Sequence, residues 1–151
     1  MYSGLVHAHS GLRWLVLVFL LLAIATAWQN WSRKVDYPQG RWALLALIFT
    51  HLQLLLGLAL YIWNAAAIKS KVQFGDMGAA MSNSIVRFYT VEHISLMLVA
   101  IAVITIGYSR AKKMSPAAEG HKALFTFYLI GLILILVSIP WPFRALGAGW
   151  F

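Results

Sequence analysis

The sequence predicts an all-α integral membrane protein, a four-helix bundle in a single domain over residues 1–151. Of its residues, 62% are hydrophobic and only 11% are charged, with a mean hydropathy of +0.78. This composition lies outside the range of soluble domains. Four apolar runs, at roughly 12–31, 42–63, 91–108 and 123–140, each approach the ~20 residues that cross ~30 Å of hydrocarbon.

The first two helices are bounded by a chain breaker and by tryptophans. We expect the first helix over about residues 3–31, before a turn that contains Pro38. The second should run over about 42–64, framed by Trp42 and Trp63, which would lie ~31 Å apart along a helix. Because tryptophan favours the two membrane interfaces, this separation indicates one complete crossing.

One long connection separates the second helix from the third. Residues 65–81 mix glycine, lysine and aspartate, which is typical of a surface loop. Ser82 or Asn83 is the predicted N-cap of a third helix over about 83–109. A fourth helix should cover about 116–139, because a Ser-Pro pair precedes it and two prolines follow it.

The basic residues predict the orientation of the chain. Four spans place both termini on one side, and the two short turns on the other side carry more cations. Since basic segments favour the cytoplasm, we expect a multi-pass protein of the bacterial cytoplasmic (inner) membrane with both termini periplasmic. The turns hold Arg33, Lys34, Arg41, Arg110, Lys112, Lys113 and Lys122, against Lys69, Lys71 and Arg144 on the other side.

Charge and cysteine content exclude several classes of function. A net charge of +8 would suggest nucleic acid in a soluble protein, but here the basic residues cluster at helix ends. At those positions they set topology and contact lipid headgroups, so we expect membrane lipids and no nucleic acid as partners. The absence of cysteine excludes disulfides, thiolate-bound iron–sulfur clusters and thioether-attached haem.

Ionisable residues inside membrane spans are costly and usually face a bundle interior, so each is a candidate for function. His51 is nearly central on the second helix, whereas His9 and His93 lie toward the periplasmic side of the first and third. His121, at the mouth of the fourth helix, is expected to be interfacial. The other candidates are His7, Arg13, Arg87 and Glu92.

The second helix also carries a stripe of polar and small residues. His51 lies about 100° to the side of this stripe on a helix. Small and hydroxyl residues are common where membrane helices pack, so the stripe by itself indicates helix packing. Its members are Thr50, Gln53, Gly57, Tyr61 and Asn64.

These residues match the needs of a b-type haem: two imidazoles from different helices, small residues, and cations for the propionates. His51 and His93 are candidate ligands. Their depths differ by ~9 Å, so His9 with His93 stays open as the pair. Arg13 or Arg87 would bind the carboxylates. Three small residues would leave room for the macrocycle: Gly57, Ala100 and Gly107.

Two other interpretations of the histidines stay open. His9, His51 and His93, with Glu92, would suit copper, zinc or iron bound directly. Alternatively, the same side chains form hydrogen bonds between helices and only fix the bundle.

Five segments resemble the small four-span bacterial membrane proteins labelled cytochrome b-like. They are HSGLRWLV (9–16), IFTHLQLLLGLALY (48–61), SNSIVRFYTVEHISLMLVAIAVITIGYS (82–109), SIPWPFR (138–144) and GAGWF (147–151). The resemblance covers nearly the entire chain. It implies a membrane electron carrier rather than an independent enzyme, one that serves as a subunit of a quinone-linked respiratory assembly with other membrane subunits.

That implied function leaves Glu92 with two possible roles. It would accept a proton during quinol oxidation, its pKa raised by burial, or it would form an ion pair with Arg87 or Arg13. Two alternatives to electron transfer remain. One is a cofactor-free structural subunit of a larger complex, and the other is a proton or metal conduit along His9, Glu92, His93 and His51.

Overall fold

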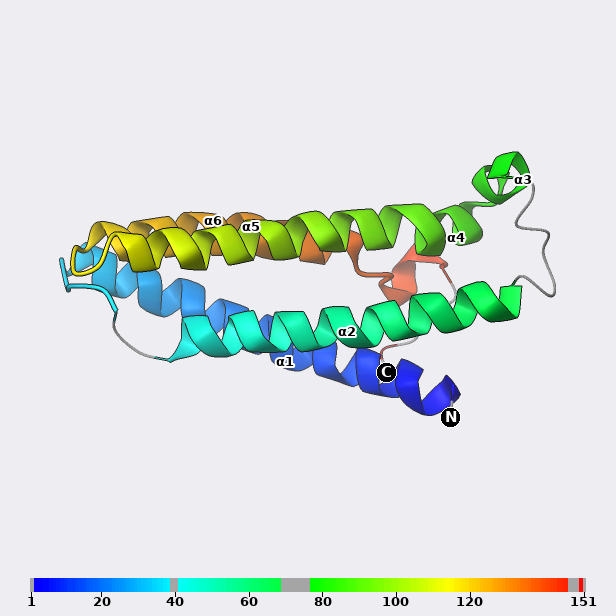
Figure 1. Ribbon diagram of the computed structural model, residues 1–151, viewed down its shortest axis with the longest axis horizontal. Helices are drawn as coiled ribbons and strands as arrows, with labels where there is room; N and C mark the ends of the chain where they lie inside the picture. The colour runs from blue at the N-terminus through cyan, green and yellow to red at the C-terminus, as the bar shows by residue number, and fades with distance from the viewer. Residues whose placement is uncertain (1, 39–40, 69–76, 147–149, 151) are drawn as a thin grey trace.

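The computed structural model of the protein describes residues 2–38, 41–68, 77–146 and 150. Every regular element in this part of the chain is helical. Both termini lie at one end of the bundle, with the short helix α3, and the two short turns lie at the other (Figure 1). We call these the terminal end and the turn end. Four of the described helices are long and apolar enough to cross a membrane, which confirms the predicted all-α bundle.

The spanning helices are continuous, except that the third begins with an irregular segment. The first two are α1 (Tyr2–Ser32) and α2 (Trp42–Ile68). The third consists of α4 (Ser84–Arg87), a π-helical turn η1 (Phe88–Glu92) and α5 (His93–Lys113). The remaining elements are the fourth spanning helix α6 (Glu119–Ser138), the short helix α3 (Met77–Ser82) and a 3₁₀ turn η2 (Pro142–Arg144).

Helix ends differ from the predicted ones by a few residues. Helix α2 continues to Ile68 and α5 to Lys113, while α6 begins at Glu119 rather than 116. The delay has a local cause, because the Ser115 hydroxyl donates to the backbone carbonyl of Tyr37 at 2.8 Å and holds the two turns together. In the predicted loop, α3 forms at the end and residues 69–76 lie outside the described part of the chain.

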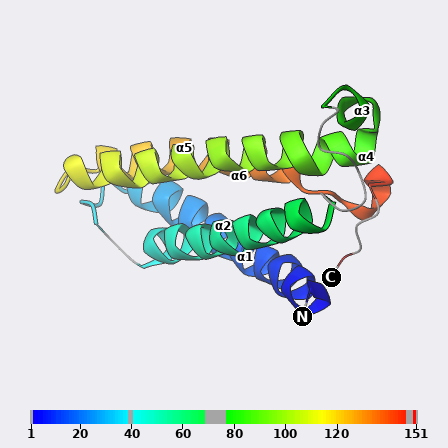
Figure 2. The same ribbon diagram turned by 45° about the vertical axis from the view of Figure 1, so that its right-hand side comes forward.

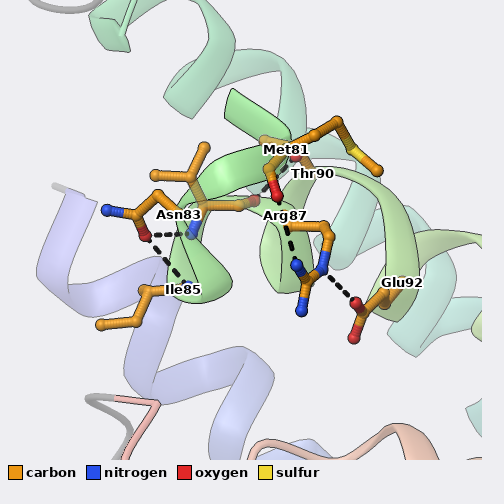
Figure 3. A network of polar contacts seen from close by, with 7 residues as sticks. Met81, Asn83, Ile85, Arg87, Thr90 and Glu92 are labelled. Carbon is orange, nitrogen blue, oxygen red and sulfur yellow. Dashed lines mark hydrogen bonds and ion pairs between the residues drawn. The ribbon is translucent and has the colours of Figure 1, made fainter. Parts of the chain in front are cut away.

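The predicted cap of the third spanning helix is Asn83. Its Oδ1 accepts hydrogen bonds from the backbone N–H groups of Ile85 at 3.0 Å and Val86 at 3.1 Å (Figure 3). These are two of the donors that a helix leaves unpaired at its start. The cap fixes where the third spanning helix begins, and so the depth at which its polar residues lie.

Close packing of α5 against α6 forms the tightest seam of the bundle. A Cβ on Gly107 would lie 2.3 Å from Cβ of Phe127, and one on Gly131 would lie 2.4 Å from Cγ1 of Ile104. Only glycine permits this approach, as is common between membrane helices. The space that Gly107 was predicted to leave for a macrocycle is therefore occupied by α6, and Ala100 is buried in the same core.

Helix α2 is the least covered of the four. It packs beside α1, and α1 in turn packs beside α6, whereas α2 and α5 diverge (Figures 1 and 2). Only 11% of its most apolar window is buried, against 39% for α6. The outer faces of all four helices carry exposed large apolar residues, which suits contact with lipid. Examples are Leu15, Leu55, Ile62, Val99 and Ile133.

Candidate functional site

The polar stripe of α2 faces the bundle. Thr50 is buried, and Gln53 donates a hydrogen bond from Nε2 to the backbone carbonyl of His9 at 2.8 Å. Gly57 lies against the His9 ring, since a Cβ there would be 3.1 Å from Cε1 of the imidazole. Tyr61 donates to the carbonyl of Thr90 at 3.3 Å and links α2 to the π-helical turn. Gln53 and Gly57 thus form one wall beside His9, whereas the side chain of Asn64, the last member of the stripe, lies outside the described part of the chain.

His51 lies apart from this wall because it is about a quarter turn away on the same helix. It is exposed, and its Nδ1 is 2.8 Å from the backbone carbonyl of Leu47, one turn earlier. His7, on α1, is exposed as well. Of the three histidines expected as ligands, the structure therefore brings together two.

Those two are His9 from α1 and His93 from α5. Their ring centres are 6.4 Å apart, and the ring planes are inclined at 75°. Nδ1 of His93 is 2.7 Å from the backbone carbonyl of Ser138. A carbonyl oxygen only accepts, so Nδ1 carries the hydrogen and Nε2 of a neutral ring keeps its lone pair. Such a hydrogen bond is the usual way in which proteins orient a histidine that binds a metal.

His9 has an incomplete set of polar partners. Its Nδ1 is buried without a hydrogen-bond partner, and so is Oε1 of the neighbouring Gln53. Buried polar atoms are nearly always paired, so two unpaired atoms in one place indicate a site for another polar group.

The π-helical turn η1 precedes His93 and sets its position. Its i→i+5 hydrogen bonds include the one from the His93 N–H to the carbonyl of Phe88. Such turns are rare and occur frequently at functional sites. The turn also brings residues five apart to one face, where Nε of Arg87 lies 2.7 Å from Oε1 of Glu92 (Figure 3). Arg87 further donates to the carbonyl of Met81 at 3.2 Å.

This ion pair occupies two of the predicted site residues. Glu92 has Arg87, not Arg13, as its partner, and the two side chains are 41% and 38% exposed. Both lie on the outer part of the third helix rather than between His9 and His93. Each therefore serves the local structure around η1.

Arg13 is the buried cation nearest to the histidines along the chain, one helical turn from His9. Its side chain is only 8% exposed, and its guanidinium lies 5.4 Å and 5.9 Å from the ring centres of Trp14 and Trp141. Nη2 donates to the backbone carbonyl of Trp150 at 2.7 Å, while Nε is buried without a partner. Within the described residues, no carboxylate lies at ion-pair distance from Arg13.

Some members of the site were not predicted from the sequence as site residues. The carbonyl of Ser138 contacts His93, and the ring of Trp141 and the backbone carbonyl of Trp150 contact Arg13, all from the end of α6 and beyond. The SIPWPFR segment gives a signal in retrospect, because its prolines end α6 and leave carbonyls without helical partners.

The described residues contain no group of three or more histidine, aspartate or glutamate side chains arranged to hold a metal ion. Comparison of the chain with family models, with curated proteins and with solved structures finds no match. The site thus consists of two imidazoles and one buried guanidinium, with three unpaired polar atoms, in the terminal half of a membrane bundle.

Proposed function

We propose that this protein is a membrane electron carrier that binds haem b through His9 and His93. The observation that supports this proposal is the pair itself: two imidazoles from separate helices whose ring centres are 6.4 Å apart. Two imidazoles on opposite sides of one metal ion, each at ~2 Å, have ring centres roughly 6 Å apart. A tetrahedral arrangement would bring the rings closer, so this spacing supports His9 and His93 as the two residues that would hold a haem iron.

The number of ligands favours haem over a bare metal ion. Two imidazoles alone leave copper, zinc or iron with open positions, and Glu92 and His51 are placed elsewhere. A haem supplies four nitrogens of its own and needs only the two axial ligands from the protein. His93 is already oriented for this role, because its Nδ1–H is held by Ser138.

Arg13 supplies the charge that a haem propionate requires. It is a buried guanidinium without a carboxylate partner in the described chain, one turn from His9. An uncompensated buried cation is costly, and a ligand carboxylate would relieve that cost. Arg87, the other predicted candidate, already pairs with Glu92.

Room for the macrocycle must come from the side of α2. The α5–α6 seam is closed by Gly107 and Gly131. Helix α2 is the least covered helix and meets the imidazole pair through Gly57, the smallest residue, so the macrocycle would enter on this side. When bound, the haem would supply one-electron chemistry, and the protein would supply its axial ligands and a counter-charge.

The same proposal includes the source of the electrons, the membrane and the partner subunits. The described residues form four apolar spans, and we propose that electrons come from quinol or from the cofactor of another membrane subunit. The basic turns favour the bacterial inner membrane with the terminal end periplasmic. The exposed apolar faces would contact lipid or the other subunits of a respiratory assembly.

A reduced-minus-oxidised visible spectrum of the purified protein, with a pyridine haemochrome assay, tests the proposal. We expect a b-type spectrum with close to one haem per chain. His9→Ala and His93→Ala should each abolish it. His51→Ala is the matched control, since it also removes an intramembrane imidazole, and it should keep the full haem content.

Retention of a normal spectrum in His93→Ala would refute the ligand assignment. Loss of haem in His51→Ala but not in His9→Ala would move the second ligand to α2. A flat spectrum of the wild-type protein, purified with its native partners, would instead favour a cofactor-free structural subunit.

A further inference from the structure

His121 is buried at the turn end, far from the imidazole pair. It lies in the first turn of α6, and its side chain is only 2% exposed. Tyr37, from the turn between α1 and α2, covers it with ring centres 5.1 Å apart and planes inclined at 71°. Gly120 permits this cover, because a Cβ there would lie 2.9 Å from Cβ of Tyr37. The first turn of α6 and the α1–α2 turn are therefore packed together around one imidazole.

The imidazole of His121 has one nitrogen without a partner. The ring hydrogen-bonds the backbone of Asp36, whereas Nε2 is buried and has no hydrogen-bond partner. An unpaired buried nitrogen is unfavourable in either tautomer: as a lone pair it needs a donor, and as an N–H it needs an acceptor. A hydroxyl group can serve as either.

His121 lines a cavity of about 110 Å³ at this end of the bundle. The volume far exceeds the ~15 Å³ that one water requires and approaches the ~150 Å³ of a cavity that holds benzene. Its walls include the aromatic residues Tyr37 and Tyr108, with Arg41 as the charged member. Size and lining thus suit a six-membered ring that bears a polar group.

The cavity lies where lipid-soluble molecules place their polar parts. It is formed by the turn-end segments of α1, α2, α5 and α6, next to Trp42 at the start of α2. Tryptophan marks the membrane interface, so an amphipathic ring could reach the cavity from the bilayer. Thr26, a wall residue on α1, is ~26 Å along that helix from His9, which separates the cavity from the proposed haem site.

We propose that this cavity binds the ring of a lipid-soluble hydroquinone. One hydroxyl pairs with Nε2 of His121, the ring lies among Tyr37 and Tyr108, and the second oxygen faces Arg41. The choice of a hydroquinone rests on the proposed function, in which quinol is a source of electrons, whereas the cavity itself is formed by residues outside the proposed haem site.

Binding of unsubstituted 1,4-hydroquinone, whose bare ring matches the size of the cavity, to the purified full chain in lipid nanodiscs tests the proposal, with quenching of tryptophan fluorescence as the readout. We expect saturable binding in the wild type and about a tenfold loss of affinity in His121→Leu, the loss expected for one buried hydrogen bond. His121→Gln keeps a donor and an acceptor and should recover part of the affinity.

A second pair of variants tests the cavity without touching the imidazole. Ala43→Leu fills the space and should reduce binding at least tenfold, because Ala43 lines the cavity. Ala102→Leu adds the same side chain on the exposed face of α5 and should leave binding unchanged.

Two outcomes would overturn the proposal. Equal affinity in wild type, His121→Leu and Ala43→Leu would place the hydroquinone elsewhere. Absence of saturable binding to a correctly folded wild-type protein would mean that the cavity holds only water. The haem spectrum is recorded for every variant, and because the two sites are far apart, its gain or loss reports on the proposed function alone.

Discussion

Replacing Gly107 by alanine should force α5 and α6 apart. The new Cβ would lie 2.3 Å from Cβ and 3.0 Å from Cγ of Phe127. Carbon atoms pack at ~3.5–4.0 Å, so the helices must separate locally by roughly 1.5 Å. Overpacking of this kind costs about 1–3 kcal/mol. We therefore expect Gly107→Ala to lower the free energy of unfolding by about 2 kcal/mol.

Gly131→Ala should act in the same way, since its Cβ would lie 2.4 Å from Cγ1 of the fully buried Ile104. Both glycines lie on one seam, and a separation forced at one relieves the clash at the other. The double variant should therefore lose less than the sum of the two single losses, as expected for neighbouring positions.

Unfolding in mixed micelles with increasing dodecyl sulfate, followed by circular dichroism, measures these changes. Gly11→Ala is the matched control, because nothing lies within 4 Å of its added Cβ. Removing a glycine from a helix interior should leave it as stable as the wild type, or up to ~1 kcal/mol more stable. If Gly107→Ala unfolds together with Gly11→Ala, the reasoning from the α5–α6 distance is wrong.

Two further predictions concern groups outside the imidazole pair. Glu92→Gln breaks the partly exposed ion pair with Arg87, so the loss of stability should stay below ~1 kcal/mol in the same micelle titration. The haem spectrum should be unchanged, and loss of haem would instead make Glu92 part of the site. Burial raises the pKa of the Tyr37 phenol in the folded protein, and Tyr108 makes a smaller contribution. The stability that Tyr37 contributes is therefore fully present below the pKa of ~10 in the unfolded chain, and it decreases as the pH rises above that value. Comparing wild type with Tyr37→Phe from pH 8 to 11 checks this sign, because the substitution should flatten the decline and an equal decline in both proteins would contradict it.

Much of the fold could be predicted because hydropathy acts locally. Apolar runs of sufficient length must cross the membrane as helices, since backbone groups have no other partners there. The Asn83 cap and the packing role of the α2 stripe also follow from local chemistry, and the structure confirms both. Helix ends were less certain because contacts between turns decide them, as between Ser115 and Tyr37.

The roles of individual polar residues depended on how the helices are rotated against each other. From composition and spacing, His51 with His93 is one candidate ligand pair, and His9 with His93 stays open as the other. Only packing turns the α2 stripe inward, which leaves His51 outside and brings His9 and His93 together. The small size of Ala100 and Gly107 can be read from the sequence, but it suits both a cofactor and a close helix contact. The position of α6 decides between them, because α6 packs against this face of α5.

The sequence by itself thus determined that the chain is a four-span bundle with imidazoles in its terminal half, because helix formation and membrane insertion depend on residues close together in the chain. The tertiary structure alone decided which imidazoles meet, that Arg13 is buried without a carboxylate partner among the described residues, and that His121 lies beneath Tyr37. These contacts join residues far apart in the chain. They depend on the rotation of each helix about its axis and on its depth in the membrane, which are set only when the neighbouring helices pack against it.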